Sequence, residues 1–189
     1  MNANASPQPP FGTFSSAFVA LDVLDRLVGP VAEALKNWEA RDAAEAVLYV
    51  DTDPDKADTA VFGETYDVPP ELSANCVVVA AKRAGTVTLA ACLALAGTRV
   101  DVNKAVRKHL EARKVSFAPM DTAVGETGME YGGITPIGLP SAWPLLIDEA
   151  VVAAPHVLVG SGRRRGKLIL PGWATARIPG AEVITDLAG

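Results

Sequence analysis

The stretch G-E-T-G-M-E-Y-G-G-I-T-P-I-G, from Gly125 to Gly138, holds five glycines and one proline, and no other stretch is so dense in residues that bend a backbone. Glycine permits positive φ angles and close approach of another backbone or a ligand, while proline fixes φ and removes a donor N–H. The composition predicts a tightly shaped loop whose main-chain N–H and C=O groups face outward. Such a loop can hold a small polar group without a charged side chain; a plain connector between two elements is the alternative.

The overall composition is that of an ordinary globular protein of one domain. The 189 residues are 49% hydrophobic and 21% charged, with a formal net charge of −5. The acidic balance argues against a broad surface that coats nucleic acid, although it leaves room for a local basic patch. The N-terminus lacks a basic segment followed by an apolar core, and no apolar run is long enough to cross a bilayer. We therefore expect a cytoplasmic protein with no membrane partner.

Cysteine and histidine are too sparse for the commonest metal sites and catalytic triads. Cys76 and Cys92 form neither a C-x-x-C pair nor a metal-ligand spacing, and both lie in apolar runs, which favours buried free thiols. His109 and His156 are isolated in the sequence. They leave little room for a His-rich zinc site or a Ser-His-Asp triad.

Short strands and short helices follow one another without a regular βαβ rhythm, which predicts an α+β fold with a mixed sheet. Apolar runs predict strands at 47–50, 76–81, 86–96, 115–118, 145–148, 157–160 and 167–170. Helical spacing predicts helices at 18–28, 31–38, 55–66 and 102–114, a short one from 119 and a weak one at 173–178. We expect residues 1–30 to form a tail, flexible to about residue 16, and an extra helix. Residues 31–189 then form the domain.

The order of the motifs resembles the YbaK/EbsC family, also called the prolyl-tRNA-synthetase-associated editing domain, over roughly residues 31–188. The motifs in order are V-P-P at 68–70, V-D-V at 100–102, T-G at 127–128, G-G-I-T-P-I-G at 132–138, L-L-I-D at 145–148 and V-L-V-G-S-G at 157–162. The resemblance implies a compact mixed sheet, partly barrel-like and flanked by helices. It also implies hydrolysis of the ester that joins a wrong amino acid to the 3′ end of a tRNA, by a free-standing trans-editing deacylase or a domain inserted in a synthetase. It implies no metal and no organic cofactor, and it makes a synthetase a second candidate partner.

The resemblance assigns the family's G-x-x-x-P loop, and with it the catalytic site, to Gly132, Gly133, Ile134, Thr135 and Pro136. Main-chain donors of this loop would hold the carbonyl oxygen as it gains negative charge, with water positioned by the substrate as the nucleophile. Residues near the substrate would be Thr127, Gly128, Asp148, Gly160, Ser161 and Gly162. From the residues alone, Ser161 is more simply a turn former, and Asp148 is equally well explained as a capping carboxylate.

One position departs from the family pattern. The family carries a lysine before the first hairpin strand, in a pattern like K-T-L-V-L, where this chain has Asn75 followed by C-V-V-V. Asparagine can hydrogen-bond but brings no charge, and a charge-assisted contact is about twice as strong as a neutral one. We count Asn75 among the catalytic candidates, with Lys82, Arg83 and the arginines at 163–165 as candidate cations in place of the lysine.

The departure keeps two other functions open. The first is a non-catalytic module of the same fold that binds an aminoacyl or nucleotide-like ligand, or a synthetase. The second is a hydrolase for another small activated acyl compound. The run Arg163-Arg164-Arg165 likewise has two interpretations, a contact to tRNA phosphate or a solvated hairpin turn.

Overall fold

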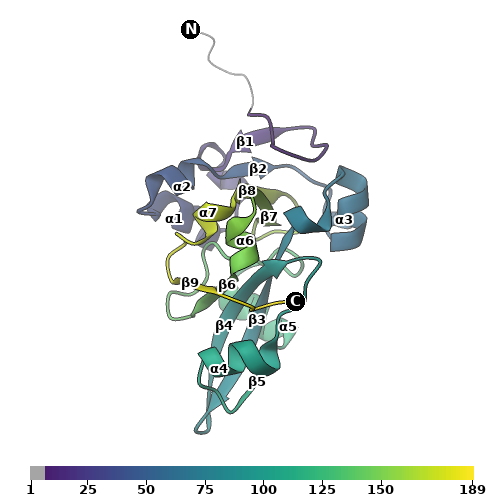
Figure 1. Cartoon of the computed structure of the whole chain (residues 1–189). Helices are drawn as coiled ribbons and strands as arrows, with labels where there is room; N and C mark the ends of the chain where they lie inside the picture. Colours follow the sequence, from purple (N-terminus) through teal and green to yellow (C-terminus); the bar gives the residue numbers. More distant parts are fainter. Residues whose placement is uncertain (1–6) are drawn as a thin grey trace.

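The computed structural model describes residues 7–189, which fold into two β-sheets with short helices packed around them (Figure 1). Residues 1–6 of the expected tail lie outside the described residues. The first sheet is antiparallel throughout, in the order β1-β2-β8-β7. Its strands are β1 (Ala17–Val19), β2 (Leu48–Val50), β7 (His156–Gly160) and β8 (Lys167–Pro171).

The second sheet is mixed, in the order β5-β3-β4-β6-β9. Strands β5, β3 and β4 are antiparallel neighbours, whereas β6 runs parallel to both β4 and β9. A parallel bridge between Ser73 and Leu158 connects the chain before β3 to β7, so the two sheets meet at that corner. The strands are β3 (Ala74–Arg83), β4 (Thr86–Leu95), β5 (Lys114–Phe117), β6 (Leu145–Asp148) and β9 (Ala181–Ile184).

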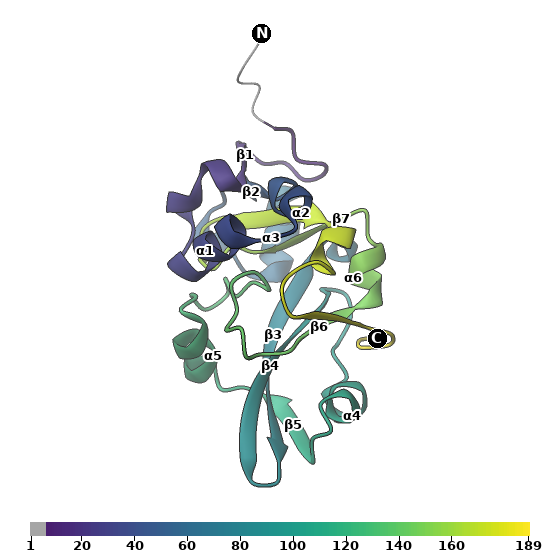
Figure 2. The same cartoon turned by 90° about the vertical axis from the view of Figure 1, so that its left-hand side faces the viewer.

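The expected α+β class is confirmed, with two sheets where the sequence predicted one. The strands predicted at 76–81 and 86–96 pair as the β3–β4 hairpin, and those predicted at 157–160 and 167–170 pair as the β7–β8 hairpin. The β3–β4 hairpin extends away from the body of the molecule, as Figures 1 and 2 show.

The helices are short and lie mainly around the first sheet and at the margins of the second (Figure 2). Gly29 and Pro30 begin α1, because proline at a first helical position loses no hydrogen bond. The α-helices are α1 (Gly29–Asn37), α2 (Arg41–Glu45), α3 (Thr59–Tyr66), α4 (Arg107–His109), α5 (Met120–Thr127), α6 (Glu149–Ala153) and α7 (Gly172–Thr175). Tighter or wider turns are the 3₁₀ segments η1 (Ala20–Asp22), η2 (Leu24–Arg26), η3 (Pro54–Lys56) and η4 (Pro70–Leu72) and the π-helical η5 (Val102–Val106).

The predicted helix at 18–28 is wrong. Residues 17–19 form β1 at the edge of the first sheet, and two 3₁₀ turns follow. Helical spacing of apolar residues was misleading, because consecutive tight turns also bring Ala20, Val23 and Leu27 onto one buried face. Further upstream, the ring of Phe14 stacks on Tyr66 at 5.4 Å between centroids, so the second half of the expected tail is packed.

The predicted helix at 102–114 is too long, because it ends at His109. Glu111 adopts a positive φ of 49°, which a helix cannot continue through. Lys114 then begins β5, which pairs with β3. Residues 114–117 join the sheet as β5, which covers an edge that β3 would otherwise expose.

Candidate active site

A cavity of about 410 Å³ lies where the glycine-rich loop meets both sheets. Its walls come from α3 and the turn before it, the first half of β3, the β5–α5 connection, the loop itself, and the ends of β7 and β8. The volume falls in the range of sites that enclose a small molecule.

The loop contributes Gly132 and Ile134 to the cavity wall. Gly133, between them, is tied to the neighbouring turn: its amide donates to Glu130 O at 2.9 Å, and its carbonyl accepts from Gly162 N at 2.8 Å. By contrast, the amides of Gly132 and Ile134 are hydrogen-bonded to no other residue of the described chain. Two residues of the cavity wall therefore have main-chain N–H groups without a partner in the described chain.

The second half of the loop lies behind this wall. Thr135 is fully buried, and its hydroxyl has no hydrogen-bond partner among the described residues. Pro136 lines a separate hollow of about 160 Å³, together with Trp38 and Trp143. The loop thus separates two hollows, and the larger one faces Gly132 and Ile134.

The β3 wall presents Asn75 and Cys76 to the cavity. Asn75 is exposed, so its amide is accessible to a ligand. Burial raises the pKa of the Cys76 thiol far above its ordinary value, and it raises the pKa of Cys92 to about 12. A thiol needs its thiolate form to attack a carbonyl, so neither cysteine is suited to act as a nucleophile.

Three of the residues predicted near the substrate have structural contacts and do not line the cavity. The Thr127 hydroxyl donates to Ala123 O at 2.7 Å, and Gly128 ends α5 with a φ of 66°. The Asp148 carboxylate caps α6 by accepting from Ala150 N, and it also accepts from Ala188 N, both at 2.9 Å.

The turn after β7 is divided in the same way. Gly160 lines the cavity, whereas Ser161 is fully buried, and its hydroxyl contacts the carbonyls of Arg163, Arg165 and Gly166 at 3.0–3.2 Å. Gly162 adopts a φ of 88°. These contacts are those of a turn former.

The three arginines of this turn contact other parts of the chain. Arg165 forms a bidentate ion pair with Asp51 at 2.8 and 2.9 Å, and its hydrogen bond holds the pKa of Asp51 below its ordinary value. Arg163 donates to Leu27 O at 3.2 Å, and Arg164 donates to Pro54 O at 3.3 Å. The run therefore fastens the β7–β8 turn to the N-terminal half of the chain.

Lys167, at the start of β8, is a cavity residue that sequence reasoning missed. Its side chain is only 6% exposed, and its ammonium donates to Gly132 O at 3.3 Å. Burial, assisted by the charge of Arg164, lowers the pKa of Lys167 to about 8. The signal in the sequence is a single lysine before the apolar run L-I-L of a buried strand.

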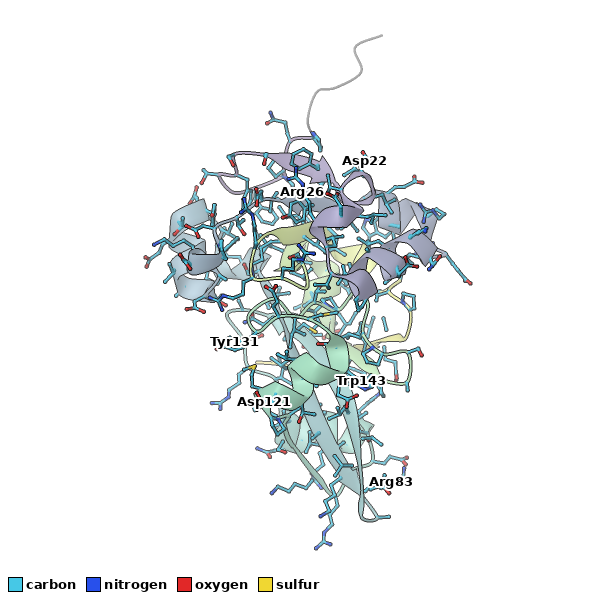
Figure 3. All side chains as sticks on the ribbon, turned by 180° about the vertical axis from the view of Figure 1, so that it is seen from behind. Asp22, Arg26, Arg83, Asp121, Tyr131 and Trp143 are labelled. Atoms are coloured by element: carbon cyan, nitrogen blue, oxygen red, sulfur yellow. The ribbon has the colours of Figure 1, made fainter. Side chains whose placement is uncertain are left out.

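Three large apolar side chains lie exposed at the cavity: Phe117 at 48%, Met120 at 47% and Tyr131 at 56%. Figure 3 shows Tyr131 at the middle of the molecule. An exposed aromatic group beside a hollow is suited to stack on a planar ring.

Within residues 7–189, no group of three or more His, Cys, Asp or Glu side chains is placed to hold a metal ion. Every helix in that range is too short or too polar to span a bilayer.

The fold and the loop define a domain of the aminoacyl-tRNA editing class. The model of the aminoacyl-tRNA editing domain family matches residues 53–178, which is more than half of the chain. The chain therefore belongs to this family, and the resemblance noted in the sequence is confirmed.

Solved structures agree on the fold. A proposed trans-editing enzyme for prolyl tRNA synthetase superposes with a TM-score of 0.68 at 15% identity, covering 84% of this chain and 97% of that one. The hypothetical protein APE2540 superposes with a TM-score of 0.71 at 18% identity, covering 82% and 99%. At these identities the likeness supports the fold alone. A search of curated protein sequences finds no match.

Proposed function

We propose that this protein is a trans-editing aminoacyl-tRNA deacylase, which hydrolyses the ester of a mischarged tRNA. The observation that carries the proposal is the cavity beside Gly132 and Ile134, whose amides are unpaired within the described chain. Family membership supports the same chemistry.

The ester carbonyl would lie against the loop, where the two amides act as an oxyanion hole. Attack by water places negative charge on the carbonyl oxygen, and fixed donors stabilise that charge without reorganising during the reaction. An aminoacyl ester is already activated, so positioning of water by the substrate together with these donors is enough. In this mechanism Gly133, Thr135 and Pro136 hold the shape of the loop, and Asn75 contacts the substrate from the β3 wall.

The cavity mouth suits the end of an RNA strand. Unpaired bases are recognised by stacking on aromatic side chains, and Phe117 and Tyr131 are exposed there. The cavity itself limits the size of the amino acid that enters, which is how an editing site rejects larger residues.

One observation favours a second candidate, a binding module without turnover. The residue at the position of the family lysine is Asn75, which lies on the cavity wall but carries no charge. Such a module would hold an aminoacyl or nucleotide-like group, or a synthetase, without cleaving an ester.

The test is loss of the ester from a panel of mischarged tRNAs incubated with the protein. We expect turnover on at least one member, with the matching free amino acid released. Binding without turnover on every member would favour the binding module. Equal rates on aminoacyl-tRNA and on simple acyl esters would point to a general acyl hydrolase.

A further inference from the structure

Lys167 is a buried cation that forms no ion pair within the described chain. Its side chain is 6% exposed, and no carboxylate lies within 4.0 Å of its ammonium in residues 7–189. Its ammonium contacts the Gly132 carbonyl at 3.3 Å and the face of Phe62, whose centroid is 5.5 Å away. Two charged groups act on it from outside contact distance: Arg164 lowers its pKa, and Asp58, which lines the same cavity, raises it. Lysines are almost never buried unless they are paired, because desolvating the charge is costly.

The fold does not require a lysine at this position. The next three residues of β8 are apolar and buried, so an apolar side chain would continue the pattern. What sets position 167 apart is its place in the cavity, opposite Gly160 in the sheet and against the loop at Gly132. Asn75 lines the same cavity from the other sheet.

We propose that Lys167 is a catalytic residue, whose ammonium contacts the carbonyl oxygen of the aminoacyl ester and supplies the positive charge that Asn75 lacks. The inference rests on the proposed function, and it adds a residue that lies outside the motifs that carry the resemblance. The lowered pKa of about 8 leaves the ammonium mostly charged at pH 7, as this role requires.

Lys167 forms no covalent bond in this step. The oxygen of water adds to the ester carbonyl carbon, and the bond from that carbon to the ribose oxygen breaks. One proton goes to the ribose oxygen and one to solvent, and the amino acid leaves as its carboxylate. The ammonium stabilises the oxyanion between these two events.

The first test compares Lys167→Met with wild type on the tRNA that wild type deacylates best. We expect kcat to fall about 100-fold, the loss typical of removing one oxyanion donor. Lys167→Arg, which keeps the charge, should lose less, and Lys36→Met, at an exposed lysine of α1, should match wild type. Circular dichroism checks that each variant is folded.

Two further measurements separate catalysis from a structural role. The double variant Asn75→Lys/Lys167→Met returns a cation to the cavity from the other wall. Its kcat should be at least tenfold higher than that of Lys167→Met. The ratio of wild-type to Lys167→Met rates should also fall as pH rises through about 8, where the lysine loses its charge.

If wild type turns over and Lys167→Met is within twofold of it at pH 7, the inference is overturned while the proposed function stands. If no tRNA is deacylated by wild type, the proposed function itself fails.

A separate observation concerns the far end of the second sheet, where basic residues gather on the tip of the β3–β4 hairpin and the elements beside it. Figure 3 shows Arg83 at this end. The exposed cations of this basic end are Lys82, Arg83, Lys104, Arg107, Lys108, Arg113 and Lys114. Among them, the ion pairs within the described chain involve Arg83 alone, with Glu111 at 2.8 Å.

The arrangement works against stability. Lys82 and Lys114 are direct partners across the β3–β5 pair, and like charges placed opposite each other destabilise a sheet. Lys104 and Lys108 are four residues apart along η5 and α4, where like charges also repel. A chain with net charge −5 has nonetheless concentrated these cations at one end.

The basic end is connected to the cavity by two strands. Val78 of β3 and Phe117 of β5 line the cavity, and Lys82 and Lys114 lie three or four residues further along the same strands. At about 3.3 Å per residue the separation is about 10–13 Å along the strands. We infer that the basic end binds the phosphate backbone of the RNA stem whose 3′ end enters the cavity; this too rests on the proposed function.

The test uses Lys82→Ala/Lys114→Ala on two substrates, full aminoacyl-tRNA and a short aminoacylated single strand without the stem. We expect KM for the tRNA to rise about tenfold, with a salt dependence shallower by about two phosphate contacts. KM for the short strand and kcat for both should stay unchanged, as should all values for Lys36→Ala. The inference is overturned if KM and the salt dependence on the tRNA stay unchanged, or if KM rises equally for both substrates. It is also overturned if the protein binds anionic vesicles but not tRNA.

Discussion

Gly160 lies directly against Gly133, and a Cβ at position 160 would stand 2.4 Å from the Gly133 carbonyl oxygen. The same Cβ would be 2.6 Å from the carbonyl oxygen of Ile134. The end of β7 therefore packs closely against the backbone of the loop that borders the cavity. We expect the separation between the backbones of Gly160 and Gly133 to determine the position of the loop amides.

Gly160→Ala should displace the loop, because backbone atoms cannot move aside as a flexible side chain can. We expect a loss of roughly 1–3 kcal/mol in the free energy of unfolding from overpacking. We also expect deacylation to fall at least tenfold, since small misplacements of a catalytic group are costly. Urea unfolding and single-turnover deacylation measure the two effects.

Gly125→Ala is the matched control, because nothing lies within 4 Å of a Cβ at this exposed position of α5. It should gain about 0.5–1 kcal/mol from helix propensity and keep wild-type activity. Wild-type activity in Gly160→Ala would mean that this contact does not position the loop.

The exposed ring of Tyr131 at the cavity mouth predicts a defect in substrate binding. Tyr131→Ala should raise KM for aminoacyl-tRNA about tenfold, because stacking on one base contributes roughly 1–3 kcal/mol. Tyr131→Phe should stay near wild type, since it keeps the ring. Trp173→Ala removes an aromatic side chain that is 44% exposed on α7 and does not line the cavity, so it should change KM little. A KM for Tyr131→Ala equal to that of wild type would mean that Tyr131 does not stack on a base of the substrate.

The local elements of the candidate site could be predicted from the sequence, whereas the contacts between segments far apart in the chain could not. Glycine density predicted the loop within 125–138, and the family resemblance assigned the segment 132–136 to the site. Apolar runs and turns predicted the hairpin that carries Gly160 and the one whose first strand begins next to Asn75. These features depend on neighbours in the sequence. Lys167 was missed because the direction of its side chain depends on the pairing of β8 with β2 and β7, and on how the sheets meet at Ser73.

The same reasoning explains the error at residues 18–28. A spacing of three or four residues between apolar positions is shared by an α-helix and by successive 3₁₀ turns. The backbone of β2 decides between them, because Phe18 is paired with Tyr49 at the edge of the sheet. That partner lies about thirty residues away in the sequence, outside any local window.

A substitution at Thr135 tests whether this buried residue contributes to the stability of the loop or to catalysis. Its hydroxyl is buried and unpartnered in the described structure, and a buried polar group without a hydrogen bond is destabilising. Thr135→Val keeps the branched shape, so we expect it to gain roughly 1 kcal/mol in the free energy of unfolding. Deacylation should stay within threefold of wild type, because the residue does not line the cavity. A large loss of kcat in a stable variant would instead assign the hydroxyl a direct role.

Lys167 predicts a cost in stability that depends on pH. Folding lowers its pKa from the ordinary 10.5 to about 8, so between these values the unfolded chain holds the proton more tightly than the folded one. When the unfolded state binds more protons, stability rises with pH, so the destabilising effect is complete below pH 8 and is relieved as pH approaches 10.5. A shift of this size corresponds to roughly 3 kcal/mol at most, from which the lost hydrogen bond to Gly132 O must be subtracted.

Lys167→Met should therefore be more stable than wild type at pH 7 while being the less active protein. The gap in the free energy of unfolding should narrow as pH is raised from 8 to 10, and comparing the two proteins cancels the titration of other groups. Urea unfolding at pH 7, 8, 9 and 10 measures the gap. A variant less stable than wild type at pH 7 would mean that the lysine is there to hold the loop. A gain in stability together with a loss of turnover is the pattern of a buried charge retained for catalysis.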